Sequence, residues 1–164
     1  MKRIAMVALA MIALPLTGCG ESAKSSSDSQ AVQRQADLYQ LEQVEKTWHK
    51  ASSTHDVDLM MSLWAPDATF NIGPETLDGK AQIRKFFATK VGAFKPENHW
   101  VSETPAYKIR MTVDGDKGTL YFECHYVDIK TQKIVSTVGA DQNMQKINGT
   151  WLITSSAAAP VALG

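Results

Sequence analysis

The chain has 164 residues, about the length of one domain. Its 17 basic and 17 acidic side chains cancel, and without the N-terminal Lys2 and Arg3 the balance is 15 basic against 17 acidic residues. With no run of basic residues anywhere, this composition argues against a nucleic-acid-binding protein and against electrostatic binding to anionic lipid.

The first 18 residues have the pattern of an export signal. Lys2 and Arg3 form a basic start, residues 4–16 are almost wholly apolar, and Leu-Thr-Gly precedes Cys19. The apolar run is shorter than the roughly 20 residues that a membrane span needs. This ending resembles the bacterial lipoprotein signal, which implies that Cys19 becomes the lipidated first residue of a protein anchored in the cell envelope, outside the cytoplasm. An ordinary signal peptide with an incidental cysteine is the alternative.

The segment after the signal is small and polar. We expect residues 19–30 to form a flexible tether between the lipid and a single domain over residues 31–160. If Cys19 carries lipid, Cys124 has no partner for an intramolecular disulfide. Cys124 lies in an apolar, alternating stretch, so an inert buried thiol is favoured there over a nucleophile.

Two helices are predicted at the start of the domain. The first, over residues 31–53, places apolar side chains three and four residues apart. These are Leu38, Leu41, Val44, Trp48 and Ala51. Asp56 is a suitable N-cap for a second, short helix that Pro66 stops. Its apolar face would carry Met60, Leu63 and Trp64.

A short strand and a third helix follow. Residues 68–72 alternate between apolar and polar side chains, and Gly73-Pro74 breaks the pattern before a turn-rich loop. The third helix begins at Asp78 or Gly79 and ends at Gly92. Its buried face would carry Ile83, Phe86, Phe87 and Val91.

The rest of the chain is predicted to be strand. Strand patterns occupy residues 99–101, 107–113, 119–128, 134–147 and the segment from residue 151. Hairpin turns are predicted at residues 114–118 and at Asn148-Gly149. Long antiparallel strands after three helices indicate an α+β domain, with the helices packed on one face of a bent sheet.

The order of these elements, with SLWAPDATF at residues 62–70, Gly79, and IRKFF at residues 83–87, resembles the SnoaL-like branch of the nuclear transport factor 2-like superfamily over residues 36–156. The resemblance implies a cone: a curved antiparallel sheet wrapped around three helices and open at one end. Members include ketosteroid isomerase, scytalone dehydratase, polyketide cyclases and non-catalytic binding modules, so the fold alone does not fix a function. Many members are homodimers that pair through the outer sheet.

Aromatic side chains would line such a cone and form a site for a small, largely apolar molecule. The candidate lining residues are Trp48, Trp64, Phe70, Phe87, Trp100, Tyr107, Phe122 and Tyr126. Each of them can instead be ordinary core, because a small cone can be packed solid.

The catalytic groups of the family are incompletely matched. Ketosteroid isomerase uses an aspartate in the region that residues 71–73 occupy here, and no carboxylate is present there. The dehydratases use a histidine oriented by a carboxylate. His99 falls at the expected histidine position, but the carboxylate position corresponds to Ser53. Asp141, on a late strand, is the other candidate catalytic residue, although a surface position is favoured for it.

Glu123 and His125 share one face of their strand, opposite Cys124 and Tyr126. If the apolar face meets the helices, which is favoured, Glu123 and His125 point outward, toward a possible dimer interface. In the reverse register they enter the pocket as an acid and a base. No spacing of histidine, cysteine and aspartate matches a metal site, and no cofactor is expected.

These features favour an envelope-anchored protein that binds a small, largely apolar molecule in its cone and forms a homodimer. The second hypothesis is a cofactor-independent lyase or isomerase, with His99 as base and Asp141 or a tyrosine as helper. The third is a structural lipoprotein, which a cone filled by Trp and Met side chains would favour.

Overall fold

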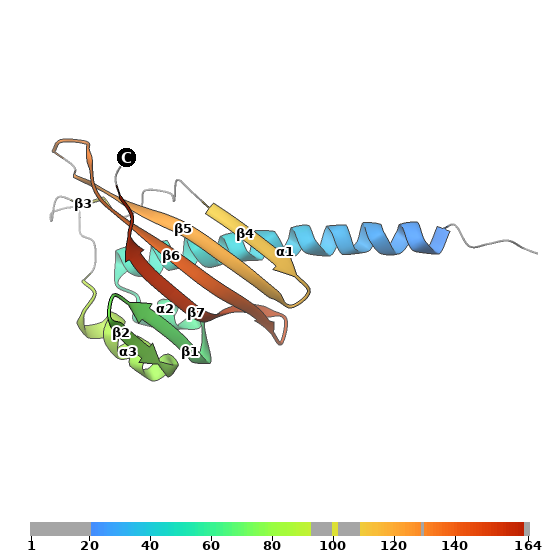
Figure 1. Cartoon of the computed structure of the whole chain (residues 1–164), viewed down its shortest axis with the longest axis horizontal. Helices are drawn as coiled ribbons and strands as arrows, with labels where there is room; N and C mark the ends of the chain where they lie inside the picture. The colour runs from blue at the N-terminus through green and yellow to red at the C-terminus, as the bar shows by residue number, and fades with distance from the viewer. Residues whose placement is uncertain (1–20, 93–99, 102–108, 129, 163–164) are drawn as a thin grey trace, which may run out of the picture.

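The structure is a computed structural model that describes residues 21–92, 100–101, 109–128 and 130–162 (Figure 1). The predicted signal over residues 1–18, Cys19, His99 and Tyr107 lie outside these residues. The described chain forms three helices and a seven-stranded sheet, which confirms the predicted α+β class.

Helix α1 (Glu21–Thr54) is the longest element, and only its C-terminal part packs on the sheet. Residues 27–36 are all exposed, and this part of the helix extends beyond the sheet (Figure 1). Residues 21–30 are thus part of this helix, within the segment for which the sequence predicts a flexible tether over residues 19–30. The physical reason is that extending a helix already nucleated by packing adds one hydrogen bond per ordered residue, even without burial.

Long as α1 is, no helix in the described part of the chain is apolar enough over a sufficient length to cross a membrane.

Helix α2 (Val57–Ser62) begins as predicted: the Asp56 side chain accepts a hydrogen bond from the Leu59 backbone N–H at 2.9 Å. It ends sooner than predicted, because Trp64 already belongs to strand β1 (Trp64–Ile72). Pro66 lies inside that strand. The β1 register shifts between Trp64 and Thr69, and such an irregularity accommodates a proline that cannot donate to the ladder.

Strand β2 (Glu75–Asp78) pairs antiparallel with β1 where the sequence predicts only a loop. Helix α3 (Gly79–Thr89) then starts at the predicted position and buries Ile83 and Phe87. Gly79 has a φ of +78°, a backbone conformation that residues with a side chain rarely adopt, and so it permits the abrupt change from strand to helix.

The remaining strands are β3 (Trp100–Val101), β4 (Ile109–Asp114), β5 (Lys117–Asp128), β6 (Ile134–Ile147) and β7 (Thr150–Pro160). The sheet order is β2-β1-β7-β6-β5-β3, with β4 also paired to β5. All pairs are antiparallel except β1 with β7, so the predicted antiparallel sheet is in fact mixed. No hairpin joins β1 to β7, and a turn therefore does not dictate their relative direction.

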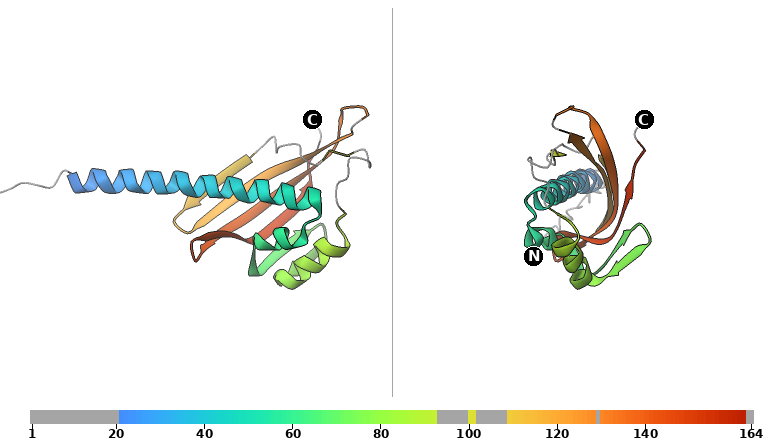
Figure 2. Two further views of the ribbon diagram at one scale, coloured as in Figure 1. Left: turned by 180° about the vertical axis from the view of Figure 1, so that it is seen from behind. Right: turned by 90° about the vertical axis from the view of Figure 1, so that its left-hand side faces the viewer.

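The sheet curls around α1, with α2 and α3 covering the side where β1 lies (Figure 2). The core lies between the concave face of the sheet and the helices, and it includes Leu41, Val44, Trp48 and Ala51 from the predicted face of α1. The Asn148-Gly149 turn is confirmed: both residues have positive φ, 51° and 80°, as a two-residue hairpin turn requires.

Candidate functional site

The described interior of the cone is filled by aromatic rings. Trp48 is at its centre, with ring centroids 5.7 Å from Trp64, 5.7 Å from Phe87, 5.8 Å from Phe122 and 6.2 Å from Phe70. All five side chains are at most 7% exposed. They are core rather than the lining of an open pocket. Of the other predicted lining residues, Trp100 lies in β3 and Tyr126 in β5, and their side chains are outside the described part.

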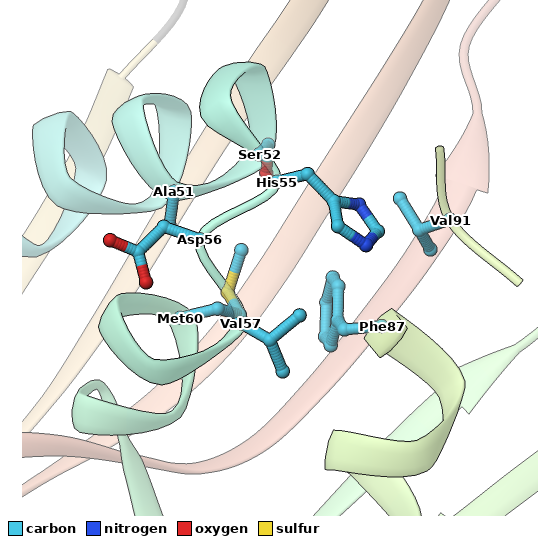
Figure 3. A pocket seen from close by; sticks show the side chains of 8 residues that line it. All are labelled: Ala51, Ser52, His55, Asp56, Val57, Met60, Phe87 and Val91. Carbon is cyan, nitrogen blue, oxygen red and sulfur yellow. The ribbon is translucent and has the colours of Figure 1, made fainter. Parts of the chain in front are cut away.

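A small hollow remains between the end of α1, α2 and α3, where Phe87 borders the aromatic cluster. Figure 3 shows the His55 imidazole beside Phe87 and Val91, while the Asp56 carboxylate points away. The cavity volume is about 10 Å³, enough for roughly one water molecule. This hollow is too small for an organic ligand.

Polar atoms are nevertheless buried within the same interior. Gln142 and Ser156 are directly paired across β6 and β7, and they are 0% and 2% exposed. Among the described residues, neither side chain has a hydrogen-bond partner, and neither does Nε1 of the fully buried Trp64. An unsatisfied buried polar group costs about 1–3 kcal/mol, so four such atoms in one core require a physical explanation.

A second polar group joins α1 to the concave face of β5. Glu45 Oε1 lies 2.7 Å from His49 Nδ1, and His49 Nε2 lies 2.9 Å from the Cys124 sulfur. The Glu45 carboxylate is buried, whereas the imidazole and the thiol are both partly exposed. The imidazole also packs edge-on against Phe122, with 5.4 Å between ring centroids.

The His49 ring is held in its charged form. Burial opposes that charge, but the hydrogen bonds to Cys124 and Glu45 outweigh it and raise the pKa of His49 to about 9. In enzymes with an activated nucleophile, a carboxylate orients an imidazole, and the imidazole acts on the nucleophile. Glu45, His49 and Cys124 are hydrogen-bonded in that order. Cys124, predicted to be an inert thiol, thus has an ionisable partner.

The sequence reasoning missed His49 as a site residue. A signal was available in the spacing of Glu45 and His49, which lie four residues apart on one helix, next to residues of its predicted apolar face. The contact with Cys124 joins residues 75 apart in the chain, so only the fold brings it about.

Glu123 and His125 lie on the outer face of β5, as the favoured register predicts. Glu123 accepts a hydrogen bond from the Tyr121 hydroxyl at 2.9 Å, and its other oxygen lies 3.1 Å from His125 Nε2. Burial and the Glu123 carboxylate raise the pKa of Tyr121. Asp141 is exposed on this same outer face, opposite Tyr121, and so does not reach the concave side. This is the surface position that the sequence analysis favours for Asp141 over a catalytic one.

In the described part of the chain, no group of three or more histidine, cysteine or acidic side chains could hold a metal ion. Glu45, His49 and Cys124 form a line through the imidazole rather than converging on one point.

The curved sheet and the helices that it encloses make this a cone-shaped α+β protein, with a fold similar to that of nuclear transport factor 2-like structures. A family model for the SnoaL-like domain matches residues 44–153, and the chain belongs to that family. No protein of curated function matches the sequence.

Solved structures show the same fold at low identity. A nuclear transport factor 2-like protein with a cystatin-like fold from Novosphingobium aromaticivorans matches 90% of this chain and 94% of its own, at 12% identity and a TM-score of 0.62. A proposed dehydratase of the nuclear transport factor 2-like family from Streptomyces avermitilis matches 79% of this chain and 99% of its own, at 16% identity and a TM-score of 0.60. At these identities the likeness concerns the fold alone.

Proposed function

We propose that the protein is a binding module whose cone takes up a small, largely apolar molecule carrying polar atoms. The observation that supports this is the group of buried, unpartnered polar atoms on Gln142, Ser156 and Trp64 within an aromatic interior. Binding sites of this kind are mostly apolar and contain a few placed polar groups. The dense packing of the five aromatic rings is the observation that favours the structural hypothesis instead, and binding therefore requires a small molecule and rings that move apart on its entry.

The proposal is tested with native mass spectrometry of protein purified from its own host. Wild type should retain a small molecule, and Gln142→Met, which keeps the side-chain shape but removes its polar atoms, should lose it. Gln145→Met is the matched control, since Gln145 lies on the exposed face of the same strand. A wild-type protein with nothing bound, or a Gln142→Met variant that still retains the molecule, would contradict the proposal.

A cofactor-independent lyase or isomerase is the second candidate function. It is favoured by the 2.7 Å contact between His49 and Glu45, which supplies the carboxylate-oriented imidazole that His99 is predicted to lack. The base would then be His49, and because its pKa is about 9, it would accept a proton only at alkaline pH. Its Nε2 is engaged by the Cys124 sulfur, so a substrate would have to displace that contact. Removal of a proton from an enone-like substrate that persists in His49→Gln would count against this candidate.

We propose membrane attachment through lipidated Cys19 and homodimerisation through the outer sheet, both from the sequence resemblances. If Cys19 is the anchor, Cys19→Ala should shift the protein from the membrane fraction to the soluble fraction. Sedimentation equilibrium should give twice the mass of one chain, and a monomer mass would rule out the dimer.

A further inference from the structure

The Cys124 sulfur lies at the end of a relay of hydrogen-bonded side chains that the proposed binding function does not use. The relay runs from Glu45 through His49 to Cys124 over contacts of 2.7 and 2.9 Å. Two members come from one turn of α1 and the third from the concave face of β5. Cys124 as a residue is partly exposed, and the first experiment below tests whether a small reagent reaches its sulfur.

The groups around the sulfur can be named from each element that packs against it. From α1, Glu45 and His49 face it; from β6, its directly opposed neighbour is the uncharged Val138. On its own strand, Phe122 shares its face and contacts the imidazole. The described charge nearest to the sulfur is thus the imidazolium. A cationic imidazole beside a sulfur stabilises the thiolate, and the thiolate is the nucleophilic form.

We infer that Cys124 is a nucleophilic thiol that captures small, apolar carbon electrophiles such as enones, with His49 as its proton partner and Glu45 as a positioning residue. This inference does not depend on a ligand at Gln142. It requires no metal, oxidant or cofactor, only the electrophile itself.

The capture step is a conjugate addition. The Cys124 thiolate forms a bond from sulfur to the β-carbon of the enone, and the π electrons of the carbon–carbon double bond move to the α-carbon and carbonyl oxygen as an enolate. The His49 imidazolium then returns one proton to the α-carbon. The saturated thioether ketone contains every atom of the thiol and the enone, and His49 is left neutral, hydrogen-bonded to Glu45.

The choice of an apolar electrophile follows from the walls around the relay. Phe122 lies against the imidazole, and Trp48 lies 5.8 Å from Phe122 between ring centroids. Both rings are buried, so the relay borders an apolar interior, and an uncharged enone approaches it without desolvating a charge.

The first experiment measures the rate of alkylation of Cys124 by iodoacetamide in the full chain, followed on the Cys124 peptide by mass spectrometry between pH 5 and 10. We expect His49→Gln to slow the reaction at pH 6.5 by at least about tenfold, which corresponds to about 1.4 kcal/mol. Glu45→Gln should move the pH profile to higher pH, and Glu45→Asp should partly restore it. His55→Asn, at a positive φ that asparagine tolerates, is the matched control and should react as wild type does.

An unchanged or faster reaction in His49→Gln would overturn the inference, because a purely structural histidine would protect the thiol and its loss would expose it. A folding defect in the variants does not remove the test, since wild type alone can be compared with its own unfolded chain. The half-maximal pH of alkylation in the folded protein should lie below that of the same peptide in urea, and an equal or higher value would also overturn the inference.

The second experiment incubates the protein with 2-cyclohexen-1-one. The intact mass should rise by one molecule of the enone, with the adduct on the Cys124 peptide and a markedly slower reaction in His49→Gln. Alkylation by iodoacetamide without any enone adduct would show that the thiol is reactive but that the conjugate addition is wrong.

Discussion

Asp37 is buried where α1 meets the sheet, and three donors converge on its carboxylate. Lys146 Nζ lies 2.6 Å and Trp151 Nε1 3.0 Å from Oδ1, and Gln33 donates to Oδ2 at 3.2 Å. Burial raises the pKa of Asp37, but these hydrogen bonds outweigh it and hold the pKa below the ordinary value. This carboxylate ties the helix to β6 and β7.

Replacing Asp37 with Asn should lower the free energy of unfolding by about 2 kcal/mol, because it leaves the partly buried Lys146 without its counter-charge. Urea unfolding followed by tryptophan fluorescence measures this. Asp58→Asn is the control: its pair with Arg84 is exposed and should contribute under about 1 kcal/mol. Equal losses in the two variants would refute the anchoring role.

Since the pKa of Asp37 is lowered in the folded protein, its contribution to stability is present above pH 3.8. This contribution is lost as the pH falls through the pKa that Asp37 has in the folded protein.

His49 makes stability depend on pH in the opposite direction. Its pKa is about 9 in the folded protein and 6.5 in the reference state, so the folded chain binds more protons between these values. The stabilisation is complete below pH 6.5 and is lost as the pH rises through 9. We expect the unfolding free energy of wild type, measured relative to His49→Gln, to fall across this interval. A difference that stays constant between these two pH values would disagree with a protonated ring.

At the scale of single elements, turns with positive φ can be predicted from the sequence because only a few residue types tolerate them. Gly149 has a φ of 80°, and a methyl group added to its Cα would have no other atom within 4 Å. Gly149→Ala should therefore cost about 1 kcal/mol through backbone strain alone. Gly92→Ala, where space is also open and φ is not positive, is the control and should be nearly neutral in thermal unfolding. A neutral Gly149→Ala would show that the turn relaxes.

Other element boundaries are less accessible to sequence reasoning. Trp64 fits a helical stripe with Met60, and Pro66 has the character of a stop signal, so the sequence predicts that β1 starts at Ala68 instead of Trp64. The four residues of β2 carry no alternation strong enough to identify them. The predicted start of α1 is too late because residues 21–30 have nothing to bury, whereas helix extension depends on hydrogen bonding as well as burial.

At the scale of the whole molecule, the fold class and the buried face of α1 follow from periodicity, which a curved sheet on helices requires. The candidate site cannot be predicted from periodicity. Aromatic residues such as Trp48, Phe70 and Phe122 can line a pocket or fill a solid core. Which of the two forms depends on the volume that the sheet and helices enclose, and this volume cannot be read from the sequence. The pairing of His49 with Cys124 likewise depends on how closely the sheet wraps α1.

The parallel pairing of β1 with β7 has a consequence for how the protein folds. Strand β7 lies between β1 and β6 and pairs with both, yet it follows all the other described strands in the chain. The strands β1 and β2 therefore stay separate from the later hairpins until β7 has been synthesised. Contacts between residues so far apart in the chain slow folding. Before β7 pairs with β1, the unpaired edge of β1 is available to other chains.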